Sequence, residues 1–190
     1  MATHTLSEIT ATATKATRAA GFSWGVAEEA GLAVRRLSAH GLPGAEALAV
    51  LLTNKGASSV GDQGPAPGCG LSKMIEMLDM PPHSPAQLGP IKAPLLVVGF
   101  ALADDGHWTV GWPGGAVHAG PEGLMLSGAL PGPVAPVSVR QGCSTGQPLT
   151  AHWRSRPVAP DAWEKLEVLA ATLLVPESER SRTSGAGPDA

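Results

Sequence analysis

The sequence predicts an α+β protein in which N-terminal helical hairpins pack on an antiparallel β-meander, with a C-terminal helix. Residues 1–54 repeat apolar side chains at helical spacing, residues 93–158 contain short β-type runs separated by Gly and Pro, and residues 160–174 return to helical spacing. Helices followed by strands are typical of α+β proteins, not of parallel α/β sheets. At 190 residues, we expect one domain covering 1–190.

The N-terminal helices have recognisable start and stop signals. Thr5 and Glu8 have the spacing of a capping box, in which the side chain of each residue accepts a hydrogen bond from the backbone N–H of the other. Gly21 ends this first helix. Ser23 is a natural N-cap for a second helix, which ends at Gly41. Tight turns join these helices, so we expect them to be antiparallel neighbours.

The chain changes its periodicity after the third helix. That helix begins at Pro43 or Gly44 and ends at Gly56, and a short helix is predicted over Leu71–Met80. Residues 55–70 and 81–94 are rich in Gly and Pro and are predicted to be loops.

Short β-type runs follow. Leu95–Leu102 is predicted to be a strand, Asp104-Asp105-Gly106 a hairpin turn, and His107–Trp112 the antiparallel return strand. The remaining predicted strands are Ala116–His118, Leu124–Ser127, Val134–Arg140 and Leu149–Arg154. Their many prolines indicate that some of them are edge strands.

The last helix is predicted to open at Pro160. Asp161 and Glu164 have the spacing of a second capping box, and Trp163 and Leu166 begin an apolar face.

Composition excludes several classes of partner. The net charge is −3 and the 13 Lys and Arg residues are scattered, so we expect no nucleic-acid partner. No apolar run approaches the ~20 residues that span a bilayer, so we expect no membrane partner. The N-terminus has no signal-peptide pattern, which predicts a cytoplasmic protein with Cys69 and Cys143 as two free thiols.

No common catalytic or cofactor signature is present. Gly142-Cys143-Ser144-Thr145-Gly146 matches the serine-hydrolase pattern, but no helix start follows it, so we interpret it as a hairpin loop. A nucleophilic Cys143 with His118 or His152 as its base is the weaker alternative. The histidines do not pair at metal-binding spacings and no C-x-x-C occurs, so we expect no metal site and no cofactor.

The start of the second helix combines a cap with acidic and aromatic side chains. We interpret Ser23 as the cap, Trp24 as a buried core residue, and Glu28 and Glu29 as acids in the first turns that complement the helix dipole. Deleting a core aromatic side chain costs about 3–5 kcal/mol, which is the expected effect of Trp24→Ala. The same four residues are ligand-binding candidates.

Gly25 and Gly31 support that second interpretation. Each occupies a predicted helical position, where Gly costs about 1 kcal/mol relative to Ala. Gly at such positions indicates the close approach of another backbone or of a ligand.

The C-terminal segment offers two arginines. In Glu177–Arg182, Arg180 and Arg182 would lie on one side of an extended chain and could bind a carboxylate or a phosphate. The alternative is a solvated tail. We expect the segment to dock near the Ser23–Glu29 turn.

Two stretches resemble a bacterial domain-of-unknown-function family. These are Gly21-Phe22-Ser23-Trp24-Gly25 with the following Val26-Ala27-Glu28-Glu29-Ala30-Gly31, and the C-terminal segment from Leu174 to Gly187. The Leu42–Glu46 turn is similar as well. The resemblance implies no activity, and no catalytic residue is carried over from it.

Three interpretations of function remain. The first is binding of a small polar or anionic metabolite, in a role accessory to a catabolic enzyme, with Ser23, Trp24, Glu28, Glu29, His118, Arg180 and Arg182 as candidate ligand-binding residues. The second is a small-molecule hydrolase or lyase that uses Glu28 or Glu29 with His118. The third is a structural subunit whose Trp and Gly surfaces form a homo-oligomer interface.

Overall fold

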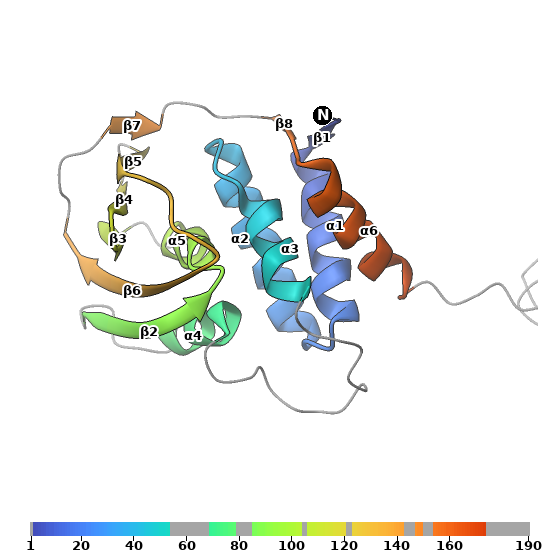
Figure 1. Cartoon of the computed structure of the whole chain (residues 1–190), viewed down its shortest axis with the longest axis horizontal. Helices are drawn as coiled ribbons and strands as arrows, with labels where there is room; N and C mark the ends of the chain where they lie inside the picture. The colour runs from blue at the N-terminus through green and yellow to red at the C-terminus, as the bar shows by residue number, and fades with distance from the viewer. Residues whose placement is uncertain are drawn as a thin grey trace, which may run out of the picture.

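The computed structural model describes residues 2–53, 69–78, 85–103, 106–120, 123–142, 147–149 and 154–173. In these ranges the chain folds as an α+β protein. A layer of helices lies on one side and a six-stranded antiparallel sheet on the other, with the short helix α5 between them (Figure 1). The predicted fold class is confirmed.

The helical layer contains three N-terminal helices and one from the end of the described chain. These are α1 (Leu6–Ala19), α2 (Trp24–Ala39), α3 (Gly44–Thr53) and α6 (Pro160–Ala171). Helices α1 and α2 form a hairpin, and α6 packs against α1 and α3 (Figure 1). The layer is therefore completed by a segment distant in sequence.

The signals that start and end the first two helices act as predicted. The Glu8 N–H donates to Thr5 Oγ1 at 3.2 Å, and the Thr5 N–H donates to Glu8 Oε2 at 2.7 Å, which completes the capping box. Ser23 Oγ accepts a hydrogen bond from the backbone N–H three residues further on at 3.4 Å. Gly21 and Gly41 follow the helix ends with φ of 90° and 74°, a conformation that favours glycine.

The start of α6 differs from the prediction. The helix is capped at Ala159, whose side chain cannot accept a hydrogen bond, so the predicted Asp161–Glu164 capping box is wrong. Glu46 of α3 binds this helix start instead: its Oε1 accepts from the Ala159 N–H at 3.3 Å, and its Oε2 pairs with Arg156 Nη1 at 3.2 Å. The cap of α6 is thus a tertiary contact.

A small antiparallel sheet joins the beginning of the chain to the segment before α6. Strand β1 (Thr3–Thr5) pairs with β8 (Ser155–Pro157). The ring of His4 in β1 stacks on Trp163 of α6, with ring centroids 3.7 Å apart and 20° between the planes. Both contacts hold α6 in place.

The large sheet has strand order β2-β6-β3-β4-β5-β7. Its strands are β2 (Ala86–Lys92), β3 (Trp108–Trp112), β4 (Gly115–Gly120), β5 (Gly123–Gly128), β6 (Val134–Gln141) and β7 (Gln147–Leu149). Strands β3, β4 and β5 form the predicted meander. Strand β6 then returns to the other side of β3 and pairs with both β3 and β2. Of the strand predicted over Leu149–Arg154, only Leu149 lies in a strand, and residues 150–153 are outside the described ranges.

Strand β2 corrects the prediction of a loop over residues 81–94. It is an edge strand with a register shift between Leu88 and Pro90, where Gly89 is the extra residue. An edge strand tolerates Pro because one side of its backbone has no partner strand, and Gly in a strand is typical of a bulge. The same residues that mimic a loop in the sequence therefore form a bulged edge.

Leu95–Leu102 is also corrected, from strand to helix. Residues Leu95–Ala101 form α5, and Leu95 to Phe100 are all buried between the sheet and α2. A short run that is apolar on every side has no periodicity that separates helix from strand. Gly99 allows the close contact, since a Cβ there would lie 2.7 Å from the Ala33 carbonyl oxygen of α2. Helix α4 (Gly70–Leu78) packs against α5.

The two faces of the sheet differ in chemistry. The inner face supplies core residues that are 1–2% exposed: Val110, Val117, Leu124, Val137 and Val139. Because side chains alternate along a strand, the intervening residues lie on the outer face. That face carries small and polar side chains together with Met125, Val134 and Pro136, and the candidate site lies there.

Candidate functional site

Trp24 is 55% exposed, so the prediction that it is a buried core residue is wrong. It is the first residue of α2, where its side chain is not covered by the packed face of the helix. The guanidinium of Arg18 lies 5.6 Å from the centre of the Trp24 ring. This is a cation–π distance, worth about 0.5–1 kcal/mol at an exposed site. Of the neighbouring acids, Glu28 is exposed and Glu29 is half-buried.

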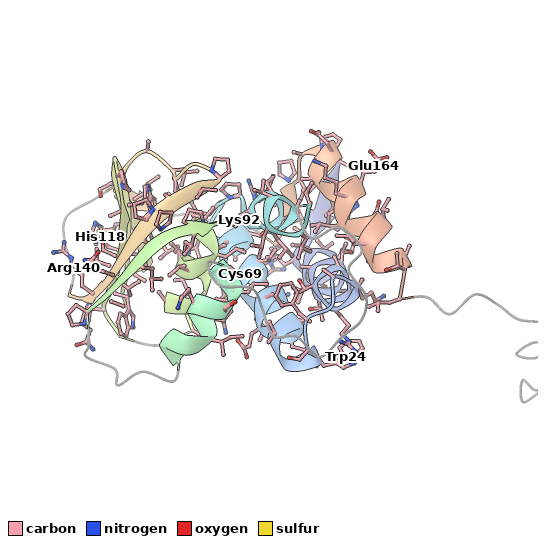
Figure 2. The ribbon with its side chains drawn as sticks, turned by 60° about the horizontal axis from the view of Figure 1, so that its bottom comes forward. Trp24, Cys69, Lys92, His118, Arg140 and Glu164 are labelled. Carbon is pink, nitrogen blue, oxygen red and sulfur yellow. The ribbon has the colours of Figure 1, made fainter. Side chains whose placement is uncertain are left out.

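The candidate residues from the sequence do not converge. His118 lies in β4 of the sheet, and Trp24 lies at the far end of the helical layer (Figure 2). The helix start with Glu28 and Glu29 therefore provides no acid beside His118. Arg180 and Arg182, with the rest of the segment from Glu177, lie outside the described residues.

The two glycines of α2 have different surroundings. A Cβ on Gly31 would overlap Oγ1 of Thr14 in α1 and come within 3.1 Å of the Thr10 carbonyl oxygen. A Cβ on Gly25 would meet nothing within 4 Å. The predicted close approach is therefore found at Gly31, where the partner is another helix, and not at Gly25.

The outer face of the sheet brings together several polar side chains around His118. The strand register places Thr109 of β3 directly between His118 of β4 and Arg140 of β6. His118 is 2% exposed and Thr109 is 3% exposed. Figure 2 shows His118 and Arg140 close to each other at the sheet end of the molecule. Buried polar groups in proteins need hydrogen-bond partners, and the buried residues His118 and Thr109 both have them.

Hydrogen bonds fix the His118 ring in place. Thr109 Oγ1 lies 2.9 Å from His118 Nδ1 and donates to the Gly142 carbonyl oxygen at 2.7 Å. On the other side of the ring, Ser127 Oγ of β5 lies 3.4 Å from His118 Nε2. Thr109 and Ser127, from the strands on either side of β4, therefore both contact the His118 imidazole.

Burial lowers the pKa of the His118 imidazole below its ordinary value, and the positive charge of Arg140 lowers that pKa further. The ring is therefore neutral at neutral pH, able to accept a proton or a hydrogen bond at one nitrogen. Arg140 is exposed and forms no ion pair with any other described residue.

A hollow lies beside this cluster on the outer face. Its volume is about 260 Å³, and it is lined by Gln87, Gly111, Trp112, Pro113, Pro136, Val137 and Ser138. Gln87, Ser138 and Gly111 are paired in register across β2, β6 and β3, and the same row continues through Ala116 to Ser127. Gly111 has no side chain and Ala116 has only a methyl group, so the middle of this row does not protrude between the polar residues at its two ends. We call this row, together with Thr109, His118 and Arg140, the sheet-face site.

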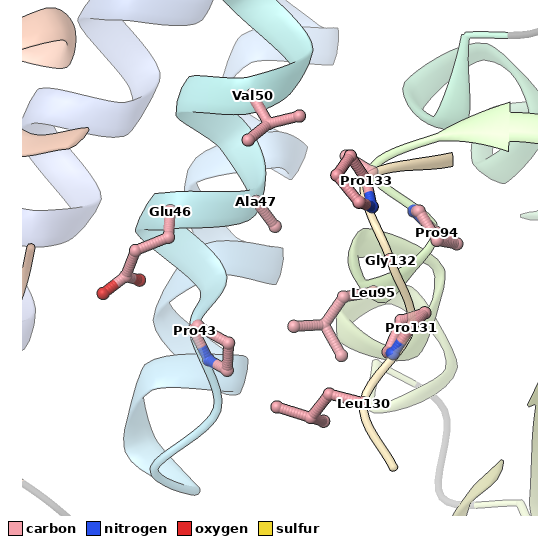
Figure 3. Close-up of a pocket in the computed structure, with 11 residues that line it drawn as sticks. Pro43, Glu46, Ala47, Val50, Pro94, Leu95, Leu130, Pro131, Gly132 and Pro133 are labelled. Atoms are coloured by element: carbon pink, nitrogen blue, oxygen red, sulfur yellow. The ribbon is translucent and has the colours of Figure 1, made fainter. Parts of the chain in front are cut away.

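A second hollow, between α3 and residues 130–133, is apolar. It measures about 190 Å³, and its walls include Val50, Leu95, Leu130 and several prolines (Figure 3). Its one acidic lining residue, Glu46, directs its carboxylate away from the groove toward Arg156 (Figure 3). The groove thus offers shape and apolar surface but no reactive group.

Cys69 is a buried free thiol, and Cys143 lies outside the described residues. Within the described ranges, no three His, Cys, Asp or Glu side chains gather closely enough to hold a metal ion. In the same part of the chain, no helix is long and apolar enough to cross a membrane.

Sequence reasoning identified His118 but missed Thr109, Ser127 and Arg140. A usable signal exists in Pro113-Gly114, which is a two-residue turn between β3 and β4. A two-residue hairpin loop fixes the register, which places His118 opposite Thr109. Arg140 could not be found in this way, because β6 reaches β3 from a distant part of the chain.

Comparison with known proteins finds a family match in the N-terminal part of the chain. Residues 4–89 match the model of a family described as a protein of unknown function (DUF3726). The matched residues include α1–α3 and end within β2, before the strands that carry His118. No curated protein and no solved structure matches the chain.

Proposed function

We propose that this protein binds a small anionic metabolite, such as a carboxylate, at the sheet-face site. The observation that carries the proposal is the cluster of hydrogen-bonded polar residues around His118 on the outer face, beside Arg140, which forms no ion pair with another described residue. A sheet face that only meets solvent needs no imidazole that is 2% exposed and held from both sides.

Charge supports an anionic ligand. Arg140 is a permanent cation without an ion-pair partner among the described residues, and a guanidinium binds carboxylates through paired hydrogen bonds. His118 is neutral and hydrogen-bonded, so it contributes orientation and not charge. The positive charge at this place contrasts with the chain's net charge of −3.

Size supports a small ligand. Sites for drug-sized molecules have volumes of about 300–1,000 Å³, whereas the hollow on the outer face measures about 260 Å³. The amide of Gln87 lies at its edge and can donate to carboxylate oxygens, and the Ser138 hydroxyl beside it donates to the Gly111 carbonyl oxygen at 3.4 Å. Short hydroxy acids and dicarboxylates fit this volume and polarity.

Titration with acetate, malonate, succinate and glycolate tests the proposal, with glycerol and ethanolamine as neutral and cationic controls. We expect at least one carboxylate to raise the melting temperature at millimolar concentration and to shift the backbone amide signals of Gly111 and Gly142. Arg140→Gln should abolish both effects. Arg35→Gln is the matched control, because Arg35 is an exposed arginine on α2.

Two results would overturn the proposal. One is that no anion in the panel stabilises the protein. The other is that Arg140→Gln and Arg35→Gln retain the same response, which would mean that the anions act through general surface charge.

A further inference from the structure

The hydrogen bonds of Thr109 determine which nitrogen of His118 carries the proton. A threonine hydroxyl has one hydrogen to donate, and Thr109 donates it to the Gly142 carbonyl oxygen at 2.7 Å. Toward His118 Nδ1, 2.9 Å away, Thr109 Oγ1 must therefore accept. The neutral ring is protonated at Nδ1 and has its lone pair on Nε2.

That lone pair faces a serine hydroxyl. Ser127 Oγ lies 3.4 Å from His118 Nε2 and also 3.4 Å from the Ala116 carbonyl oxygen. Rotation of the hydroxyl hydrogen about the Cβ–Oγ bond selects between these two acceptors. Ser127 is half-buried, so part of its surface remains open to a small molecule.

Rigid strands hold these groups in position. Ser127 pairs in register with Ala116, two residues before His118 on the neighbouring strand, and so occupies the diagonal position on the same face. Sites built on strands keep their geometry better than sites built on loops. Hydrogen bonds run from the Gly142 carbonyl oxygen through Thr109 and His118 to Ser127. In this order Thr109, held by Gly142, is the orienting group, His118 is the base and Ser127 is the nucleophile.

We propose that Ser127 is a nucleophile, with His118 as its general base and Thr109 as the positioning residue, in the hydrolysis of a small carboxylic ester. The Ser127 oxygen attacks the carbonyl carbon while its proton passes to His118 Nε2. The bond between the carbonyl carbon and the alcohol oxygen of the ester then breaks. The leaving oxygen takes the proton from His118 Nε2 and departs as an alcohol.

Water completes the reaction. It attacks the acyl carbon and gives a proton to His118 Nε2, and the Ser127 oxygen leaves and recovers that proton. The net change is ester plus water giving acid plus alcohol. The acid is the class of molecule proposed above to bind at Arg140, and the inference rests on that proposed function for the orientation of the acyl group alone.

A fluorophosphonate probe tests the nucleophile without an anionic ligand. The serine oxygen forms a bond to phosphorus, fluoride leaves, and the serine proton passes to His118. We expect mass spectrometry to find the probe on Ser127. Labelling should be absent in Ser127→Ala and about 10²–10⁴-fold slower in His118→Gln, the range for loss of a general base.

Ser155→Ala is the matched control, because Ser155 is a half-buried strand serine in the small sheet. It should be labelled at the wild-type rate on Ser127. Thr109→Val should slow labelling and change its pH profile, and Thr109→Ser should restore both, which a merely structural residue would not do. Circular dichroism checks that each variant is folded.

A second variant keeps the test informative if the probe does not fit. In Ser127→Cys the new thiol should react with iodoacetamide faster at neutral pH than in Ser127→Cys/His118→Gln, because the imidazole takes its proton. Equal alkylation rates, or equal labelling rates in wild type and His118→Gln, overturn the proposal. Labelling without anion binding would overturn the anion site alone, and anion binding without labelling or thiol activation would overturn the nucleophile alone.

Discussion

Replacing Glu46 with alanine should lower the free energy of unfolding by about 2–3 kcal/mol. The Glu46 carboxylate accepts from Arg156 Nη1 at 3.2 Å and from the Ala159 N–H at 3.3 Å. The side chains of the pair are only 24% and 14% exposed, so solvent screens the interaction weakly. A hydrogen bond to a charged group contributes about 1.5–3 kcal/mol, and these long distances place each contact at or below the lower end of that range.

A double-mutant cycle isolates the ion pair from the cap. Arg156→Ala removes the partner of Glu46 and also the 2.6 Å hydrogen bond from Nη1 to the Leu42 carbonyl oxygen. We expect Glu46→Ala and Arg156→Ala together to cost about 1 kcal/mol less than the sum of the two single changes, because they remove one shared contact. Glu28→Ala, at an exposed acid outside this network, should change stability by less than about 0.5 kcal/mol.

Urea unfolding followed by circular dichroism measures these differences, provided that the m-values stay equal. A change below about 0.5 kcal/mol in Glu46→Ala would refute the reasoning, since the cap of α6 would then not depend on α3. Strict additivity in the cycle would show that Glu46 and Arg156 stabilise the fold independently.

Three further predictions concern single residues. Gly31→Ala should lower the free energy of unfolding by about 1–3 kcal/mol, because the new methyl group would overlap Thr14. Gly25→Ala should raise it by about 0.5 kcal/mol, because a Cβ there meets nothing within 4 Å and Ala favours the helix. Urea midpoints of the two variants that move in the same direction would contradict this. Trp24→Ala should cost less than about 1 kcal/mol, and Trp24, at 55% exposure, should be reached by acrylamide in a fluorescence assay; a loss of about 3 kcal/mol would contradict its exposure. Because burial lowers the pKa of His118 in the folded protein, the unfolded chain takes up this proton first, so the free energy of unfolding should fall as the pH drops below about 6.5 toward the folded pKa. His118→Gln should flatten that fall. An NMR titration midpoint of His118 at or above about 6.5 would argue against this prediction.

The local sequence determined the ends of the first helices and the class of the fold. Thr5 and Glu8 complete a capping box within one turn, and Gly21 and Gly41 end α1 and α2 through their own backbone conformation. Such signals depend on residues three or four positions apart, so no distant part of the chain can change them easily. The meander β3–β5 follows from short strands and tight turns in the same way.

Other elements depended on what packs against them. The run in α5 is buried on every side, and its choice of helix is made by the contact with α2, where Gly99 meets Ala33. Strand β2 exists because β6 returns beside it, and α6 is capped by Glu46 from α3. Each of these contacts joins segments that are far apart in sequence, so no local pattern encodes it.

The candidate site shows the same division. The sequence by itself singled out His118 as a titratable residue on a strand, and it placed Ser23 correctly as a helix cap. Only the tertiary structure placed Thr109, Ser127 and Arg140 around the imidazole, and it separated His118 from Trp24. The physical reason is strand order: side chains on neighbouring strands meet according to register and sheet topology, and long-range pairing sets both.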